Sequence, residues 1–463
     1  MALPVNEVLV GDCRDVFQTL PEESVHCVVT SPPYWGLRDY GVAPSAWGGD
    51  PACAHAWGRQ ERGRRKDVLP AEESEAGRLG LDDRSSGGSD GGRFCQGCGA
   101  WLGQLGLEPT LDLYVEHLVG IFRQVRRVLR DDGTVWLNLG DSYVSNAAHT
   151  AWDHGFKRRN GGAVAPTGSA APARAPNATG GRASGLKPKD LVGIPWRVAF
   201  ALQADGWWLR SDIIWSKPNP MPESVQDRPT KAHEYVFLLA KSARYFYDAE
   251  AIREPHKAAS IARYEYGLRL KADPLAIKGS LHDRVQAGIG QSERMGDFIN
   301  EAGRNKRSVW TVASQPYAEA HFATFPPDLV KPCILAGTSE AGCCEACGAP
   351  RERITEKRAT GRVRQRSTGG LGTEIRRAPQ GLAPVGGTFQ EGVVVDTVGW
   401  QPTCDCDAEA APCTVLDPFC GSGTVGQVAE AHGRRWVGID VNPEYGKLAR
   451  ERTAQAGLPM LAR

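Results

Sequence analysis

The chain has 463 residues, with 55 Lys and Arg against 54 Asp and Glu and a formal net charge of +1. This length allows roughly two or three domains, and the even charge balance excludes a uniformly basic nucleic-acid-binding protein, so any such surface must be local. The thirteen cysteines occur without a secretory signal or an apolar run long enough to cross a bilayer. They predict a soluble protein of a reducing compartment, with metal sites rather than disulfides.

Short apolar runs alternate with amphipathic stretches along the chain. Glu7 to Val10 and Val25 to Thr30 predict strands, and Asp15 to Leu20 predicts a helix between them. Leu111 to Arg130 has helical spacing and is followed, after Asp131-Asp132-Gly133, by a strand from Thr134 to Leu139. The remaining predictions are a helix at 190–204, strands at 207–216 and 233–240, a helix at 325–335, a strand at 414–416, a helix at 424–431, a strand at 435–439 and a helix from 443. This alternation predicts an α/β fold with a doubly wound, mostly parallel sheet.

Two motifs each follow a predicted strand. Ser31-Pro32-Pro33-Tyr34 ends the first strand, because its prolines hold a rigid turn that lacks backbone N–H donors. Asp417-Pro418-Phe419-Cys420-Gly421-Ser422-Gly423-Thr424 follows the strand at Val415 and opens a helix. Ligands of open α/β sheets bind outside the carboxyl ends of the strands, so both motifs are expected at one ligand site.

The glycine motif predicts a cofactor site. Gly421 and Gly423 allow the backbone to approach a ligand closely, and the helix that follows presents N–H groups suited to a carboxylate. Asp440 ends the next strand and can accept hydrogen bonds from ribose hydroxyls. One alternative is a structural turn with a solvated aspartate. Another is a nicotinamide cofactor, because Gly421, Gly423 and Gly426 fit the G-x-G-x-x-G spacing, although the Asp417-Pro418-Phe419 lead-in argues against it.

Together the motifs resemble the β class of amino-methyltransferases, which methylate exocyclic nitrogens of DNA bases with S-adenosylmethionine. The resemblance covers residues 5–50, 105–255 and 308–455. It implies a Rossmann-like methyltransferase fold with a seven-stranded sheet, in which the strands near Trp207 and His233 form an antiparallel hairpin. It also implies the residues that bind the cofactor: Asp12, Asp417, Pro418, Phe419, Gly421, Ser422, Gly423, Thr424 and Asp440.

The same resemblance assigns catalysis to Ser31, Pro32, Pro33 and Tyr34. The Ser31 hydroxyl and the Pro32 carbonyl are expected to accept the amino hydrogens of a flipped-out base, while Tyr34 stacks on that base. Serine at the first position favours cytosine N4 as the target. Adenine N6 is the alternative, and a catalytically inactive, zinc-bearing DNA-binding protein is a remote one. The turn Lys217-Pro218-Asn219-Pro220 is expected to line the base pocket.

Two cysteine-rich clusters each offer four soft or borderline ligands in two close pairs. They consist of Cys53, His55, Cys95 and Cys98, and of Cys344, Cys347, Cys404 and Cys406. Their composition predicts two tetrahedral structural zinc sites in zinc-ribbon-like inserts. Reduced thiols without metal are the alternative, with Cys343 and Cys413 as spare ligands. Cys27 and Cys420 are interpreted as packing residues.

The predicted sheet is divided among residues 1–50 (the catalytic half), 105–143, 189–255, 308–342 (a helix region) and 411–463 (the cofactor-binding half). Between these segments lie zinc-binding inserts at 51–104 and 343–410, a flexible loop at 144–188 and a target-recognition region at 256–307. Basic residues predict DNA contacts in the target-recognition region, at Arg263, Arg269, Lys271, Arg304, Lys306 and Arg307. The second insert carries a further basic set, Arg351, Arg353, Lys357, Arg358, Arg362, Arg364 and Arg366. This set predicts phosphate contacts, with a solvated charged loop as the alternative.

The resemblance implies double-stranded DNA as the partner of a bacterial or phage-encoded enzyme that acts in the cytoplasm. A cognate restriction endonuclease is a second partner that such an enzyme can have. No membrane partner is expected. The oligomeric state is left open, with a homodimer as one option.

Overall fold

The computed structural model describes residues 3–37, 39–58, 93–144, 185–257, 303–315, 325–360 and 392–456. The chain divides into two compact units. The first comprises Met1–Phe246, Ser308–Thr338 and Pro412–Arg463, and the second comprises Tyr247–Arg307 and Ser339–Ala411. Most of the predicted flexible loop and of the predicted target-recognition region, including Arg263, Arg269 and Lys271, lies outside the described residues.

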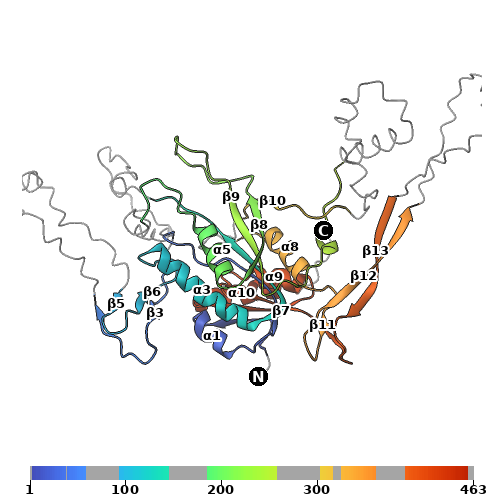
Figure 1. The fold of residues 1–463 in the computed structure, drawn as a ribbon, viewed down its shortest axis with the longest axis horizontal. Helices are drawn as coiled ribbons and strands as arrows, with labels where there is room; N and C mark the ends of the chain where they lie inside the picture. Colours follow the sequence, from blue (N-terminus) through green and yellow to red (C-terminus); the bar gives the residue numbers. More distant parts are fainter. Residues whose placement is uncertain are drawn as a thin grey trace, which may run out of the picture. The chain divides into compact units, whose positions relative to one another are not determined.

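A mixed sheet forms the centre of the first unit (Figure 1). In the described part of the chain it has eight strands, in the order β1 (Glu7–Val10), β16 (Arg435–Asp440), β15 (Thr414–Asp417), β2 (Val25–Thr30), β7 (Leu129–Leu139), β9 (His233–Ala240), β8 (Trp208–Ser216) and β10 (Val309–Thr311). Strands β1, β16, β15, β2 and β7 are parallel, whereas β9 is antiparallel to both β7 and β8. The predicted doubly wound sheet with an antiparallel hairpin is therefore confirmed.

The sheet has one strand more than the seven that were expected. Strand β10 pairs in parallel with β8 and places the buried Trp310 ring 6.2 Å from the ring of Trp136. The Trp215 indole N–H also donates to the Val312 carbonyl at 2.8 Å, just beyond β10. Three residues are too few to give a period-two pattern, so tertiary packing rather than local sequence makes this strand.

The helices form two packed groups in Figure 1, one of α1 (Cys13–Thr19), α3 (Leu111–Val128) and α5 (Ile194–Ala204), the other of α8 (Pro327–Gly337), α9 (Thr424–Ala431) and α10 (Pro443–Ala456). Helix α5 begins four residues later than predicted, because Gly193 is left-handed (φ 76°) and Pro195 occupies its first turn. Helix α3 buries its apolar face, as its spacing predicted. Residues Asp131-Asp132-Gly133 belong to β7, where the register with β2 shifts, and do not precede it.

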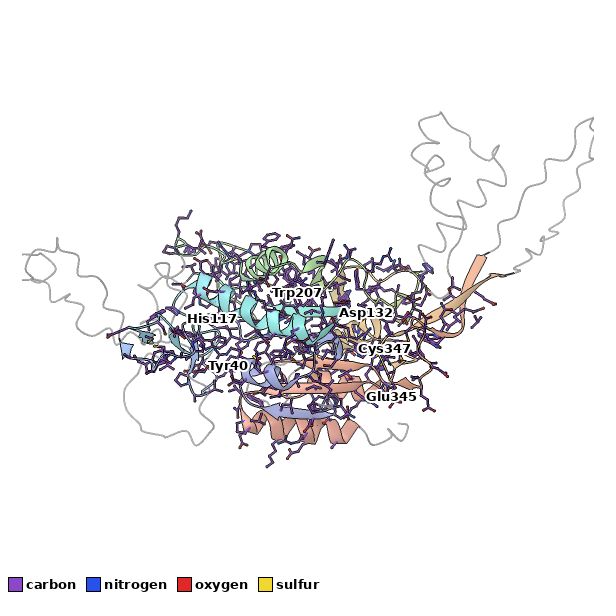
Figure 2. All side chains as sticks on the ribbon, turned by 60° about the horizontal axis from the view of Figure 1, so that its bottom comes forward. Tyr40, His117, Asp132, Trp207, Glu345 and Cys347 are labelled. Atoms are coloured by element: carbon purple, nitrogen blue, oxygen red, sulfur yellow. The ribbon has the colours of Figure 1, made fainter. Side chains whose placement is uncertain are left out.

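The first cysteine-rich insert forms a small sheet on α3. Its order is β3 (Ser45–Trp47), β6 (Trp101–Gly103), β5 (Arg93–Cys95) and β4 (Trp57–Gly58), so the insert begins before the expected boundary at residue 51. The rings of Trp47 and Trp101 stack on His117, with ring centroids 4.7 and 5.6 Å away. His117 belongs to α3 (Figure 2). The His117 ring is also 3.0 Å from the buried carboxylate of Glu108. This packing anchors the insert on the sheet-covering helix.

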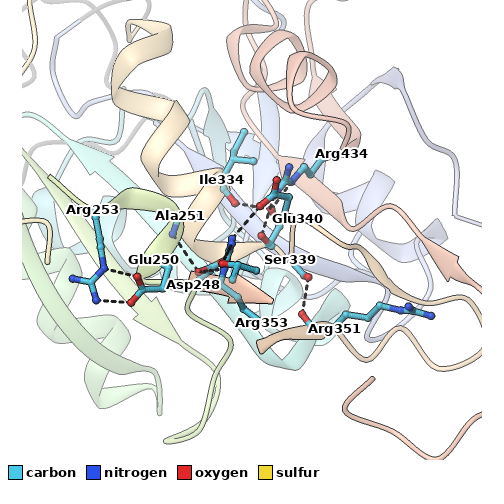
Figure 3. Close-up of polar contacts among 12 residues, drawn as sticks. Asp248, Glu250, Ala251, Arg253, Ile334, Ser339, Glu340, Arg351, Arg353 and Arg434 are labelled. Carbon is cyan, nitrogen blue, oxygen red and sulfur yellow. Dashed lines mark hydrogen bonds and ion pairs between the residues drawn. The ribbon is translucent and has the colours of Figure 1, made fainter. Parts of the chain in front are cut away.

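The second unit contains the hairpin of β12 (Arg351–Thr360) and β13 (Gly392–Pro402), the pair of β11 (Cys343–Cys344) and β14 (Ala410–Ala411), and the short helix η1 (Glu250–Ile252). Arg353 forms ion pairs with Asp248 at 2.8 Å and Glu340 at 3.0 Å (Figure 3). Its guanidinium is thus paired with two carboxylates in this structure, and the predicted phosphate contact stays a prediction. Arg304 and Arg307 likewise pair with Glu254, at 3.2 and 3.1 Å.

Candidate active site

The two sequence motifs meet at the carboxyl edge of the sheet. Strands β15 and β2 are parallel neighbours, with Val415 opposite Cys27, so they end at the same edge. Thr30, the last residue of β2, donates from its hydroxyl to the Asp417 carboxylate at 2.7 Å. The Phe419 N–H donates to the same oxygen at 3.1 Å. The strand before the predicted catalytic motif is therefore hydrogen-bonded to the first residue of the predicted cofactor motif.

The residues Ser31 to Tyr34 form the predicted catalytic turn, and the Tyr34 ring lies on the backbone of Gly140. A Cβ at Gly140 would be 2.5 Å from a ring carbon of Tyr34, so only glycine fits there. Tyr114 of α3 donates from its hydroxyl to the Pro33 carbonyl at 2.9 Å, and the Trp35 indole N–H donates to the Glu108 carbonyl at the same distance. These contacts fix the turn against α3.

The end of the first insert also packs against the catalytic turn. The Gly36 N–H donates to the Gly106 carbonyl at 2.8 Å. Gly106 has a φ of +91°, and a Cβ there would lie 3.1 Å from the Tyr34 carbonyl oxygen. The Gly106 N–H donates in turn to the Glu108 carboxylate at 2.8 Å. The segment just after the insert therefore contacts the predicted catalytic turn directly.

Two residues that sequence reasoning missed complete a polar network at the turn. Glu234 of β9 accepts from the Tyr34 hydroxyl at 2.8 Å, and its other oxygen pairs with the Lys217 ammonium. Asn138 Nδ2 of β7 lies 3.0 Å from Glu234 Oε2, 2.7 Å from the Tyr34 hydroxyl oxygen and 3.3 Å from Ser31 Oγ, and its two hydrogens are shared among these three acceptors. Burial, and then the Glu234 charge, raise the pKa of Tyr34 well above its usual value, so its hydroxyl stays protonated.

A buried cation lies close to this network. The Lys231 ammonium is shielded from solvent and has no hydrogen-bond partner among the described residues. Burial lowers the pKa of Lys231, while the charges of Asp141 and Glu234 oppose that shift. Asp141 itself caps α5, because its carboxylate accepts the N–H groups of Gly193 and Ile194 at 3.0 and 3.1 Å.

The two predicted cofactor-site glycines differ in what surrounds them. Gly421 has a φ of +49°, and a Cβ there would meet nothing within 4 Å, so open space lies over this backbone. Gly423 has a φ of +79°, and its Cβ would lie 2.7 Å from the Ala449 Cβ. Gly421 therefore fits close approach by a cofactor, whereas Gly423 is required for packing of α9 on α10.

The polar side chains of the glycine loop have protein partners. The buried Arg452 guanidinium of α10 donates to the Ser422 and Thr424 hydroxyls at 2.8 and 2.9 Å. The two carboxylate oxygens of Asp440 accept the N–H groups of Gly421 and Asn442, both at 2.8 Å. Burial raises the pKa of Asp440. The loop is thus held in one conformation by α10 and by the end of β16.

The other predicted cofactor residues lie at the same edge in different environments. Pro418 is buried, whereas Phe419 is half-buried against the core and keeps part of its ring accessible. Asp12 follows β1 and caps α1, accepting the Arg14 N–H at 3.0 Å and pairing with the Arg14 guanidinium at 2.6 Å. The Arg14 guanidinium lies 3.7 Å from the centre of the Trp47 ring. The Asp12 carboxylate is therefore engaged by the protein in this structure.

The two cysteines beside the motifs are buried. Burial raises the pKa of the Cys27 thiol to about 12 and that of the Cys420 thiol well above its usual value. A thiol that stays protonated is a poor nucleophile. Both side chains fit the packing role predicted for them.

Comparison with known proteins identifies the family. The family model for DNA methylases that act on N6 or N4 amino groups matches residues 25–344 and 413–451. The chain belongs to this DNA methylase family. The methylase is 35% identical over 443 residues to the type II methyltransferase M.XycI of Xanthomonas campestris pv. cyanopsidis, a span of 96% of this chain and 85% of that protein. It is a DNA methyltransferase that depends on S-adenosylmethionine.

Two further likenesses extend this comparison. The methylase is 32% identical over 446 residues to the type II methyltransferase M.SmaI of Serratia marcescens, covering 96% of this chain and 90% of that protein. The solved structure of the PvuII DNA methyltransferase, described as cytosine-N4-specific, is 14% identical with a TM-score of 0.41, covering 100% of this chain and 89% of that one. This structural likeness is too distant to bear on function. Within the described ranges of the methylase, no helix has the length and apolar character needed to cross a bilayer.

Each predicted cysteine cluster of the methylase comes together in space. The ligand atoms of Cys53, His55, Cys95 and Cys98 lie within 4.8 Å of one another, and so do those of Cys344, Cys347, Cys404 and Cys406. In the first cluster Cys98 Sγ is 3.4 Å from His55 Nδ1, and Cys53 Sγ is 3.7 Å from Cys95 Sγ. Backbone N–H groups of the C-x-x-C knuckles lower the pKa of Cys95 to about 6 and of Cys344 to about 7. Such thiols are suited to act as thiolate ligands.

Proposed function

We propose that the methylase transfers a methyl group to the exocyclic N4 amino group of a cytosine that is flipped out of duplex DNA. The observation that supports this most directly is the hydrogen bond between Thr30 and Asp417, because it holds the catalytic turn beside the cofactor loop. Adenine N6 is the alternative target. The preference for cytosine depends on Ser31, because in the family that this chain resembles a serine at the first motif position favours cytosine N4 as the target.

The cofactor residues proposed here differ in role. S-adenosylmethionine, when bound, supplies a methyl group on a positively charged sulfonium. Gly421 leaves room for the cofactor at the loop, and Phe419 offers part of its ring for packing. Asp440 accepts hydrogen bonds from the ribose hydroxyls. Asp12 is paired with Arg14, so the Arg14 side chain has to move before Asp12 can contact the adenine ring. Ser422 and Thr424 act through their backbone, since Arg452 holds their hydroxyls.

The catalytic residues are proposed to activate the base by accepting hydrogen bonds. The amino nitrogen of a base is a poor nucleophile because its lone pair is delocalised into the ring. Ser31 Oγ and the Pro32 carbonyl accept the two amino hydrogens and draw that lone pair out of conjugation. The Pro33 carbonyl is already engaged by the Tyr114 hydroxyl, which leaves Pro32 as the acceptor in this proposal. The Tyr34 ring stacks on the base, and most of the rate comes from positioning.

A methyl-transfer assay with labelled cofactor on unmodified duplex DNA tests this function. Digestion of the product to nucleosides distinguishes N4-methylcytosine from N6-methyladenine. Tyr34→Ala should abolish transfer while retaining cofactor binding, because the stacking ring is lost and the glycine loop is untouched. Full activity of Tyr34→Ala would refute the catalytic assignment, and absence of transfer by the wild-type protein would favour the inactive DNA-binding alternative.

We further propose that each cysteine cluster holds a structural zinc ion. Three thiolates and an imidazole in the first cluster, and four thiolates in the second, are ligand sets that zinc binds tetrahedrally. Metal analysis of the purified protein should find about two zinc ions per chain. Cys98→Ser and Cys347→Ser should each remove one ion, whereas Cys13→Ala, which alters a thiol outside both clusters, should remove none.

The biological partners proposed for the enzyme are duplex DNA and a cognate restriction endonuclease. This proposal draws on relatives named as type II methyltransferases, which cover most of the chain. Protection of DNA modified by the methylase against digestion by a panel of endonucleases tests it. Sequencing the modified DNA would give the recognition site, and unmethylated product DNA would contradict the proposal.

A further inference from the structure

Three side chains at the catalytic turn form a hydrogen-bond chain with a fixed direction. Ser31 Oγ is 3.3 Å from the Tyr34 hydroxyl oxygen, which is 2.8 Å from Glu234 Oε2. An ionised carboxylate can only accept, so the Tyr34 hydroxyl must donate to Glu234. The oxygen of Tyr34 is then left as an acceptor for the Ser31 hydroxyl.

Asn138 reinforces that direction. Because the Glu234 carboxylate only accepts, the amide nitrogen of Asn138 and not its oxygen must face it. The same nitrogen lies 3.3 Å from Ser31 Oγ and can only donate to it. Ser31 Oγ therefore gives its proton to Tyr34. The two hydrogens of Asn138 Nδ2 are shared among Glu234, Ser31 and the Tyr34 hydroxyl oxygen, which lies 2.7 Å away. Ser31 Oγ receives at most one N–H, so at least one of its lone pairs stays available.

The carboxylate at the end of the chain is itself held in place. Lys217 pairs with Glu234 Oε1, the oxygen that does not accept from Tyr34, and the two side chains are 21% and 16% exposed. The Lys217 N–H donates to the Ala232 carbonyl at 2.8 Å, so the β8–β9 hairpin presents both residues together. Glu234 can therefore remain a fixed acceptor without an uncompensated charge.

We propose that Glu234 is a positioning residue for methyl transfer: acting through the Tyr34 hydroxyl, it turns the Ser31 hydroxyl so that the free lone pair of Oγ faces the amino group of the target base. This inference rests on the proposed function, in which Ser31 Oγ accepts an amino hydrogen. A serine hydroxyl without this chain would present its own hydrogen to the amino group in part of its rotamers. The Tyr34 hydroxyl thus has a role separate from that of the Tyr34 ring.

Two variants break the chain at different points, Tyr34→Phe and Glu234→Gln. Single-turnover methyl transfer at saturating cofactor should slow by about 10- to 100-fold in each, as expected for loss of a hydrogen bond to a charged group. The KM for DNA and the cofactor affinity should stay near their wild-type values, because the stacking ring and the glycine loop are unchanged. The double variant should be no slower than the slower single variant, since both changes interrupt one chain.

Asp227→Asn is the matched control, because it removes a carboxylate from an exposed lysine pair, 2.8 Å from Lys189, outside the network. Its rate should equal that of the wild type. If Glu234→Gln fails to fold in a melting experiment, Tyr34→Phe tests the same chain. A wild-type rate in Tyr34→Phe, or additive losses in the double variant, would overturn the inference. If Tyr34→Ala is then still inactive, the proposed function stands without it.

Discussion

The Thr30 hydroxyl and the Asp417 carboxylate, which are 387 positions apart in the chain, are joined by a hydrogen bond of 2.7 Å. Asp417 is 2% exposed, so its carboxylate has exchanged water for this hydroxyl and the Phe419 N–H. Parallel pairing of β2 with β15 brings the two residues to one edge. The proposed catalytic and cofactor motifs are thereby linked to each other by a pair of side chains.

Removal of that bond should destabilise the protein. In Thr30→Val the Asp417 carboxylate loses its hydroxyl donor while staying buried, which is expected to cost about 1–3 kcal/mol. The midpoint of urea unfolding measures the effect. Thr19→Val removes an exposed hydroxyl that donates to the Val16 carbonyl and should change the midpoint little. Equal midpoints for Thr30→Val and the wild type would show that the bond contributes nothing.

Asp417 should also make stability depend on pH. Burial raises the pKa of Asp417 to about 7, so the folded protein binds a proton that the unfolded chain releases near pH 4. Stability should therefore decline as pH rises from about 4 to about 7 and level off above that range. Asp417→Asn should lack this part of the decline. Urea midpoints at about pH 5 and about pH 8 compare the two proteins, and identical pH dependence would contradict the assignment.

Gly140→Ala should impair catalysis through the Tyr34 ring. The added Cβ would lie 2.5 Å from a ring carbon, so the ring must move away from its present position. A displacement of this kind is expected to slow methyl transfer by about 100-fold. Gly120→Ala is a matched control on the exposed side of α3, where a Cβ meets nothing within 4 Å. That control should be as active as the wild type and slightly more stable.

The two glycines of the cofactor loop should respond differently to substitution. Gly423→Ala collides with Ala449 and should lower stability by about 1–3 kcal/mol. Gly421→Ala enters open space and should reduce cofactor affinity more than stability, apart from a small cost for its positive φ. Calorimetric binding of the cofactor and thermal melting separate the two effects. Unchanged cofactor affinity in Gly421→Ala would argue against the proposed cofactor position.

Loss of the zinc proposed for the first cysteine cluster should disturb the proposed catalytic turn. Cys98→Ser should loosen the insert, whose end at Gly106 contacts the Tyr34 backbone. Methyl transfer should therefore fall more than cofactor binding, because Gly106 contacts the turn directly, whereas the insert reaches the proposed cofactor residues through Asp12 and Arg14. Cys347→Ser, in the second unit, is the comparison variant. If Cys98→Ser lost its metal and remained fully active, the insert would have no part in holding the turn.

The elements that the sequence predicted well are those with clear periodicity or strong end signals. The strands ending at Thr30 and Asp417 and the helix from Leu111 occur where expected, because each combines a buried pattern with prolines, glycines or a capping residue. The three-residue strand β10 and the small sheet of the first insert depend on tertiary contacts, so no local sequence pattern predicts them.

The candidate site was predictable only in its backbone. Proline and glycine constrain the chain locally, so the two motifs could be recognised from sequence. Asn138 and Glu234 sit within strands, where a polar residue is ordinarily a solvent-facing one. Their proximity to Tyr34 results from the strand order β2-β7-β9, which sequence spacing does not contain. The pairing of Asp12 with Arg14 is local, but the Ser45 hydroxyl that also donates to Asp12 comes from the insert strand and could not be inferred from spacing.

Arg452 of α10 donates hydrogen bonds to the glycine loop, so α10 should be needed for cofactor binding. Every strand of the large sheet is complete by Asp440, so a protein shortened just after that residue could still assemble its central layer. It would lack the Arg452 guanidinium, which donates to the Ser422 and Thr424 hydroxyls. It would also lack Ala449, against which Gly423 packs. Fusion tags or truncations at this terminus should therefore be designed to spare everything through Thr453.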